Sequence, residues 1–171
     1  MIIRLETERL ILRKPVPADY PAWEAFVCDN RSRFVRGDPT VGVAWRTFST
    51  IIGHWEMRGW GLFAITVKGD DQAIGSVGPW YPGNWPEKEL GWTLWDSADE
   101  GHGYVTEAAT ETRRHVYEDL GWTTAVSYIA HGNDRSVAVA KRIGCVLDEA
   151  AATPDNDPCF VFRHPAPEAA T

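Results

Sequence analysis

Cysteine and clustered basic charge are scarce in this sequence, and it lacks any long apolar run. Its three cysteines, Cys28, Cys145 and Cys159, are odd in number and lack the spacing of metal ligands. This excludes a disulfide scaffold, predicts no metal site, and favours reduced thiols in a cytoplasmic protein. A formal net charge of -7 argues against non-specific binding to nucleic acid or anionic lipid, because both depend on clustered Lys and Arg. We expect neither a signal peptide nor a membrane helix.

What the sequence does contain is apolar and aromatic residues in a chain of single-domain length. Hydrophobic residues make up 44% of the 171 positions, and nine residues are tryptophan. A chain of this length and composition is expected to fold as one domain around a sizeable core. Most of the tryptophans are expected in that core.

The spacing of apolar residues predicts a mixture of strands and helices. Strands are expected over 7–14, 60–67, 73–80, 89–95, 123–130, 145–147 and 159–163. Helices are expected after Asp19, from Ala44 to just before Gly59, from Tyr104 to Leu120, and from Ser136 to Ile143. The stretch 30–42 has no clear period and is expected to be a loop.

The stretch from Glu89 to Leu120 joins a strand to a helix through the turn Gly101-His102-Gly103. The first N–H groups of a helix have no partner within it, and the peptide dipoles add partial positive charge there. Glycines let this backbone approach a bulky anion such as a diphosphate. The turn therefore favours an anion site, and a plain connection between strand and helix is the alternative.

The connections between strands predict the sheet. The three strands 60–67, 73–80 and 89–95 follow one another closely, so they most simply form an antiparallel meander. The helix from Tyr104 then crosses over, and a right-handed crossover places 123–130 parallel to 89–95. The predicted fold is α+β, a mostly antiparallel mixed sheet with one parallel pair, flanked by helices.

Taken together, these features resemble the GNAT N-acetyltransferase superfamily, and more closely its branch of ribosomal-protein and other N-terminal amine acetyltransferases. The matching segments are 7–13, 54–61, 101–108, 133–136 and 141–144. Their order and spacing cover most of one domain. The resemblance implies a single GNAT-like acetyltransferase domain over 1–171, with a splayed parallel strand pair and a tail that frays from about 165.

The resemblance also implies how acetyl-CoA, as cosubstrate, would bind. Its pyrophosphate would lie on backbone N–H groups of the turn and helix start, those of Gly101, His102, Gly103, Tyr104, Val105 and Thr106. Its pantetheine arm would lie where the parallel strands splay, bonded to backbone near Leu94 and Trp95 and to the Asn133 side chain. Arg142 or Lys141 would meet the adenosine phosphates.

Three positions depart from the family's pattern. Glu100 opens the turn where Arg or Gln is common, and its carboxylate is expected to weaken diphosphate binding unless it points to solvent. Val105 replaces a smaller residue. Ala140 stands where many members carry a tyrosine acid, so a tyrosine mechanism is not expected.

The implied reaction is direct acetyl transfer to a primary amine, either a protein N-terminus or a small-molecule amine. No cysteine lies in the motifs and no Ser-His-Asp pattern is visible, so no acyl-enzyme is expected. The resembling branch often places an acidic residue at this point of the strand, so the resemblance favours Glu89 as the base, directly or through water, with His131 as the alternative. Ser136 is the candidate donor to the leaving sulfur and also a natural cap of its helix.

Other interpretations remain open. Trp85, Trp92 and Trp95 are candidates to line the acceptor pocket. A catalytically degenerate acetyl-CoA-binding regulatory module is the main alternative to an enzyme. A nucleotide-binding protein is weaker, because no third glycine and no Gly-Lys-Ser/Thr complete the known fingerprints. The acceptor and the oligomeric state, including a homodimer, are not determined by the sequence.

Overall fold

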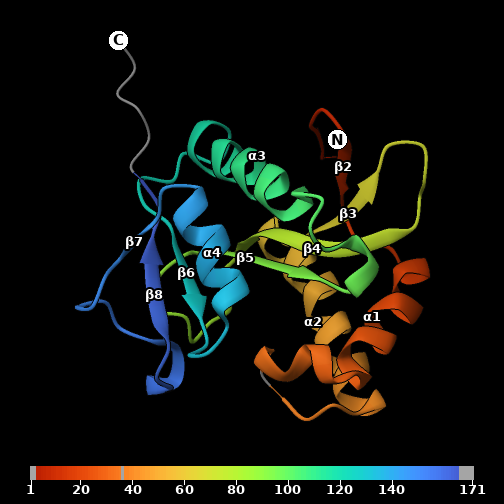
Figure 1. The fold of residues 1–171 in the computed structure, drawn as a ribbon, viewed down its shortest axis with the longest axis horizontal. Coiled ribbons are helices and arrows are strands. Elements are labelled where there is room, and N and C mark those ends of the chain that lie inside the picture. The colour runs from red at the N-terminus through yellow and green to blue at the C-terminus, as the bar shows by residue number, and fades with distance from the viewer. Residues whose placement is uncertain (1–2, 36, 166–171) are drawn as a thin grey trace.

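Figure 1 shows the computed structural model, which describes residues 3–35 and 37–165. Within them, eight strands form one sheet in the order β1-β2-β3-β4-β5-β6-β8-β7. The strands are β1 (Arg4–Glu6), β2 (Leu10–Arg13), β3 (Phe63–Val67), β4 (Ala73–Trp80), β5 (Glu89–Leu94), β6 (Val126–Ile129), β7 (Val146–Leu147) and β8 (Phe160–Arg163). The α-helices are α1 (Tyr20–Cys28), α2 (Val41–Arg58), α3 (Tyr104–Glu118) and α4 (Asp134–Arg142).

The sheet confirms the predicted topology. Strands β3, β4 and β5 form an antiparallel meander, and β6 pairs with β5 in parallel. The other pairs among the described strands are antiparallel. Expected element boundaries agree with those observed to within a few residues, as is usual for helix and strand ends.

The structure corrects the sequence interpretation at two places. Strand β1 was not expected, because three residues are too short to show a period, yet it pairs with β2 and buries Leu5. The stretch 30–42 is not a plain loop, since it contains the 3₁₀ helix η2 (Asn30–Phe34) and the start of α2. Thr40 caps α2 by accepting a hydrogen bond from the Val43 N–H. The tail expected to fray lies largely outside the described residues.

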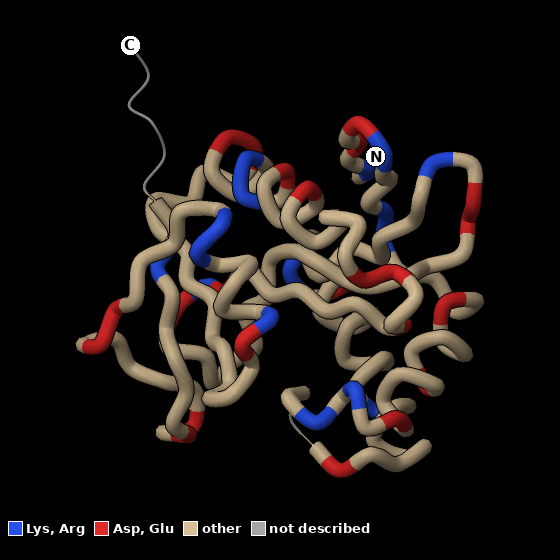
Figure 2. The backbone as a smooth tube through the Cα atoms, viewed as in Figure 1, with Lys and Arg blue, Asp and Glu red and all other residues tan. Residues whose placement is uncertain are grey.

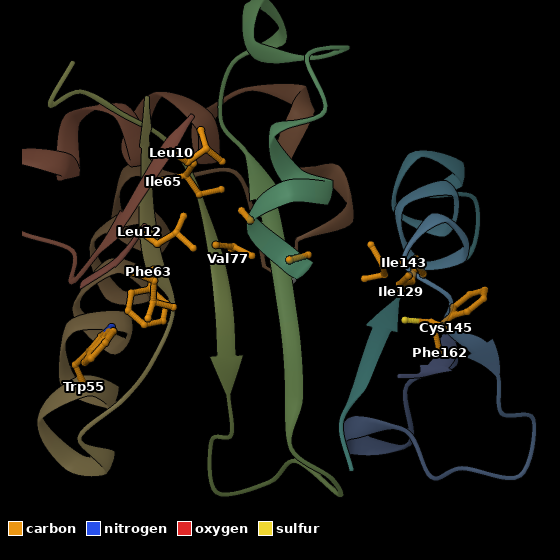
Figure 3. Packing of buried hydrophobic residues seen from close by; sticks show 14 residues of the cluster. Leu10, Leu12, Trp55, Phe63, Ile65, Val77, Ile129, Ile143, Cys145 and Phe162 are labelled. Carbon is orange, nitrogen blue, oxygen red and sulfur yellow. The ribbon is translucent and has the colours of Figure 1, made fainter. Parts of the chain in front are cut away.

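Helices α3 and α4 cover one face of the sheet, and α1 and α2 cover the other (Figure 1). Side chains alternate between the two faces along each strand. In β3, Phe63 and Ile65 pack in the cluster with Ala108 of α3, whereas Ala64 packs with Trp23 of α1. Figure 3 shows the first cluster, which continues past α3 to Ile143 and Phe162 near α4. Both layers are therefore anchored on the same strands.

The sheet opens between β5 and β6. These two strands share one registered pair, Glu89 with Val126. Figure 3 shows that they lie close at the start of the two strands and apart at their ends. No helix among the described residues is long and apolar enough to cross a membrane.

Candidate active site

A large cavity, with a volume of about 1640 Å³, lies at the splay between β5 and β6. Its walls come from both strands, from the turn before α3, from the first turns of α3 and α4, and from η2. The splay therefore joins segments that are far apart in the sequence around one space.

The glycine turn forms one end of this cavity. Gly101 and Gly103 have φ angles of +81° and +79°, a conformation that residues with a Cβ rarely adopt. No atom lies within 4 Å of a Cβ built on Gly101, so the backbone conformation, and not crowding, requires glycine there. Gly103 caps α3 without a side-chain hydrogen bond. The first N–H groups of α3 are therefore available to an anion in the cavity.

Most residues predicted to lie along the pyrophosphate line this end of the cavity. Gly101, Gly103, Tyr104, Val105 and Thr106 are among its lining residues. His102 is not among them, and its ring stacks on Tyr104 with a centroid distance of 5.3 Å.

Arg9 ties the turn to the start of the sheet, a contact that the sequence analysis missed. Its guanidinium donates to Glu107 Oε2 at 2.7 Å and to the His102 carbonyl at 2.9 Å. Glu107 also accepts from the Thr7 hydroxyl at 2.5 Å. Burial opposes ionisation of Glu107, but these hydrogen bonds prevail and hold its pKa below the usual value. The bonds fix the orientation of the first turn of α3.

Glu100 does not present a lone carboxylate to the cavity. Its Oε1 accepts from Arg31 at 2.7 Å and from Arg135 at 2.6 Å. Two guanidiniums against one carboxylate leave the group with net positive charge, so the expected penalty on an anion is offset. Figure 2 shows basic positions in η2 and at the start of α4, the segments that carry Arg31 and Arg135.

Arg142, the last residue of α4, also contacts the start of α3. Its Nη1 is 3.3 Å from Thr106 Oγ1, and it lines the cavity. Lys141 is exposed and does not line it. Of the two basic residues predicted for the adenosine phosphates, the geometry favours Arg142.

Leu94 and Trp95 behave differently, which corrects the prediction for Trp95. The Trp95 N–H donates to the Ile74 carbonyl of β4 at 2.9 Å, and its indole is buried against Trp23. Trp95 therefore neither faces the splay nor lines an acceptor pocket. Because hydrogen-bonding direction alternates along an antiparallel strand, the N–H and C=O of Leu94 point toward the β6 side. The Leu94 carbonyl lies 3.4 Å from Arg31 Nη2.

The cap of α4 is Asn133 and not Ser136. Asn133 Oδ1 accepts from the Ser136 N–H at 3.3 Å, which uses its acceptor and leaves the amide N–H₂ as a donor. Ser136 follows Asn133 by three residues and is half-buried. Both Asn133 and Ser136 line the cavity. The expectation that Ser136 caps the helix is wrong.

Of the two candidate bases, only Glu89 lines the cavity. It is half-buried at the start of β5, and its Oε2 accepts from Trp85 Nε1 at 2.5 Å. Trp85 and Trp92 line the cavity, and their place in an acceptor pocket stays a prediction. The His131 ring packs edge-on against Phe160 with a centroid distance of 4.3 Å and is not part of the lining.

Tyr128 is a lining residue that the sequence analysis missed, since nothing in the strand pattern singled it out. Its hydroxyl accepts from the Glu87 N–H at 3.2 Å, and its ring lies 6.4 Å from that of Trp85. Burial raises the pKa of Tyr128 to about 12, so it remains a hydrogen-bond donor at neutral pH. Among the described residues no cluster of three or more His, Cys, Asp or Glu is placed to hold a metal.

Comparison with known proteins gives one family. The family model described as "Acetyltransferase (GNAT) domain" matches residues 9–146. The crystal structure of an acetyltransferase from Agrobacterium tumefaciens str. C58 is 38% identical, with a TM-score of 0.89 and coverage of 96% of this chain and 95% of that one.

Two more distant structures share the fold and contain coenzyme A or acetyl-CoA. One is RimL, a ribosomal L7/L12 alpha-N-protein acetyltransferase in complex with coenzyme A, with 18% identity, a TM-score of 0.70 and coverage of 94% of this chain and 96% of that one. The other is the microcin C7 self-immunity acetyltransferase MccE in complex with acetyl-CoA and AMP, with 16% identity, a TM-score of 0.68 and coverage of 92% of each chain.

Proposed function

The chain belongs to the GNAT acetyltransferase family and is an acyltransferase, and from this premise we propose that it transfers the acetyl group of acetyl-CoA directly to a primary amine. The observation that carries the proposal is the open N-terminus of α3, which faces the cavity behind two glycines with positive φ. Arg142 lies at the same point, and Arg31 and Arg135 lie close by on Glu100. These donors and charges fit a diphosphate.

The splay fits the extended arm of the same molecule. Leu94 directs backbone groups toward it, and the Asn133 amide N–H₂ lies across the cavity on α4. These groups match the amide donors and acceptors of a pantetheine chain. RimL and MccE, which share this fold, are complexed with coenzyme A and acetyl-CoA.

In the proposed reaction the acceptor amine enters protonated and loses a proton to Glu89, directly or through water. The neutral nitrogen attacks the thioester carbon, a C–N bond forms, and the C–S bond breaks. The nitrogen then releases a second proton to solvent to become the amide, and Glu89 returns its proton to solvent. The Ser136 hydroxyl donates a hydrogen bond to the departing thiolate, whose proton comes finally from solvent. No side chain becomes acetylated in this scheme.

The acceptor we propose is a protein N-terminus or a small-molecule amine. The resemblance to the branch of N-terminal amine acetyltransferases supports the first, as does the shared fold with RimL. The end of the cavity next to Glu89 is rich in aromatic residues, including Trp80, Trp85 and Tyr128. Such rings suit the apolar part of an amine and its cationic form.

Two measurements test this proposal. Calorimetric titration with acetyl-CoA, NAD and ATP is expected to show binding of acetyl-CoA alone. Thiol release from acetyl-CoA is then measured with peptide N-termini, polyamines and aminoglycosides, and at least one amine is expected to accelerate it. Binding without thiol release across the panel would instead identify an acetyl-CoA-binding regulatory module. Binding of NAD or ATP in place of acetyl-CoA would overturn the cosubstrate.

A further inference from the structure

The hydrogen-bonded ladder between β5 and β6 stops at a side chain. The Val126 N–H donates to the Lys88 carbonyl at 3.1 Å. In a regular parallel pair the next donor from β6 would be the Tyr128 N–H, two residues on, and its acceptor would be the Leu90 carbonyl. In this structure the Leu90 carbonyl accepts from Ser127 Oγ at 2.6 Å. A hydroxyl therefore stands at the point where the ladder ends and the cavity begins.

His164 fixes the direction of this hydroxyl. Its Nε2 lies 2.9 Å from Ser127 Oγ, and both residues are almost fully buried, with exposed fractions of 3% and 2%. Since the serine hydrogen is directed at Leu90, His164 must donate through Nε2–H. Its Nδ1 is then the deprotonated ring nitrogen, and it has no hydrogen-bond partner in the described structure. The ring is therefore a neutral donor held by the segment that follows β8.

The hydroxyl has a consequence for Tyr128. Val126 directs its N–H to β5, and hydrogen-bonding direction repeats every second residue along a strand, so the Tyr128 N–H points the same way. Because the Leu90 carbonyl already accepts from Ser127, the Tyr128 N–H does not continue the hydrogen-bonded ladder with β5. It is left directed at the cavity, which Tyr128 lines.

We propose that Ser127 and His164 are positioning residues that hold β5 and β6 apart, so that the splay keeps the width needed by the cosubstrate. The inference rests on the proposed function, because it takes acetyl-CoA as the molecule in the splay. The pair acts through the strands and touches no reacting atom. Leu90, Ser127 and His164 form a three-residue pin between β5, β6 and the end of β8.

The pin remains formed over the pH range in which the enzyme would work. Burial, with a smaller contribution from Arg113, lowers the pKa of His164 to about 3. Protonation would place a hydrogen on the buried Nδ1, which has no acceptor in the described structure. The neutral Nε2–H form is a spectroscopic signature, since nitrogen chemical shifts of the ring distinguish the two tautomers.

The decisive variant is Ser127→Ala, compared with Ser127→Thr and with a matched control, Thr66→Val. Thr66 is likewise a buried strand residue whose hydroxyl donates to a neighbouring backbone carbonyl, that of Ile11 at 3.3 Å, but it pairs with Ile11 in the antiparallel β2–β3 ladder, away from the cavity. Calorimetry gives the acetyl-CoA dissociation constant of each. Thermal melts give the stability, and amide hydrogen exchange of Tyr128 reports directly on the splay.

In Ser127→Ala the Tyr128 N–H is expected to take over the Leu90 carbonyl. Its amide should become protected from exchange without ligand, and the acetyl-CoA dissociation constant should rise roughly three- to tenfold, the range of one hydrogen bond. The melting temperature should fall, because the buried His164 Nε2–H loses its acceptor. Ser127→Thr should restore the wild-type affinity. Thr66→Val should leave the affinity unchanged. His164→Gln, whose amide also carries an N–H, is a second variant if Ser127→Thr folds poorly.

Three outcomes overturn the pin. The Tyr128 amide of Ser127→Ala exchanges as in the wild type, or acetyl-CoA affinity is unchanged in that variant, or Thr66→Val weakens binding equally, which would indicate general loosening of the sheet. Failure of the proposed function is distinct, because the wild-type protein itself would then bind no acetyl-CoA. The exchange of the Tyr128 amide is measured without ligand and tests the pin in either case.

Discussion

Glu89 is the residue on which the proposed chemistry depends most. It lines the cavity, whereas His131 packs on Phe160 outside it. The hydrogen bond from the Trp85 indole holds one carboxylate oxygen of Glu89 in place. A carboxylate held in this way is suited to accept the proton of an incoming ammonium.

We predict that Glu89→Gln lowers turnover at neutral pH by roughly a hundredfold while acetyl-CoA affinity stays almost unchanged, because a general base acts on the acceptor and not on cosubstrate binding. Steady-state rates across pH, with calorimetry for affinity, check this. His131→Ala is the matched control and should turn over normally. A mutant profile with the wild-type height and acidic limb would remove Glu89 from the mechanism.

At Ser136 the structure separates two roles that the sequence left combined. Because Asn133 caps α4, Ser136→Ala should leave the melting temperature unchanged and lower kcat, with little effect on acetyl-CoA affinity. Asn133→Ala should lower the free energy of unfolding by about 1 kcal/mol, and with it the melting temperature. It should also weaken acetyl-CoA binding. Melts, calorimetry and rates on both variants give the comparison. Normal turnover of Ser136→Ala would leave protonation of the thiolate to water alone.

At the scale of elements, the backbone conformation of the turn before α3 creates the proposed diphosphate-binding site. The two glycines open the helix N-terminus, and Arg9 with Glu107 anchors it to β2. Glu100 links η2 to α4 through Arg31 and Arg135. These contacts hold three segments around the proposed diphosphate site.

For the turn, we predict that Gly103→Asp weakens acetyl-CoA binding by at least about tenfold, since it adds a negative charge beside the diphosphate and disfavours the φ of +79°. The control is Gly59→Asp, which follows α2 with a similar φ of +77° and lies outside the cavity. Both variants should lose similar stability by thermal melting. Equal acetyl-CoA affinity in the two would exclude the turn from the site.

At the scale of the whole molecule, two buried histidines link stability to pH. The Tyr81 N–H donates to His54 Nε2 at 3.0 Å, so Nδ1 must carry the hydrogen bonded to the Trp60 carbonyl at 2.9 Å. Burial lowers the pKa of His54, and burial lowers that of His164 to about 3. Both rings are neutral in the folded state.

The sign of the pH effect follows from these pKa values. An unfolded histidine takes up a proton near pH ~6.5, which the folded rings do not, so stability is complete above that pH and falls as pH falls below it. The free energy of unfolding in urea should therefore decrease between about pH 7.5 and about pH 5.5. His54→Gln should show a shallower decrease. Equal stability at the two pH values would contradict the neutral, buried state of the rings.

The sequence by itself determined the elements and the turn, because these depend on nearby residues. Apolar spacing set the strands and helices, and Gly101 and Gly103 indicated a backbone conformation that other residues rarely adopt. Short connections then predicted the meander, and the right-handed crossover through α3 predicted the parallel strand. The family resemblance, confirmed by the match over residues 9–146, came from the order of these local features.

Only the tertiary structure decided which side chains meet. Glu100 is paired with residues 69 and 35 positions away, and no local pattern specifies such partners. Trp95 faced the core and His131 faced Phe160 because strand register and loop path decide side-chain direction. The contact of Ser127 with His164 likewise spans 37 residues. Local interactions select elements, but a site assembled from separate elements exists only once the chain has packed.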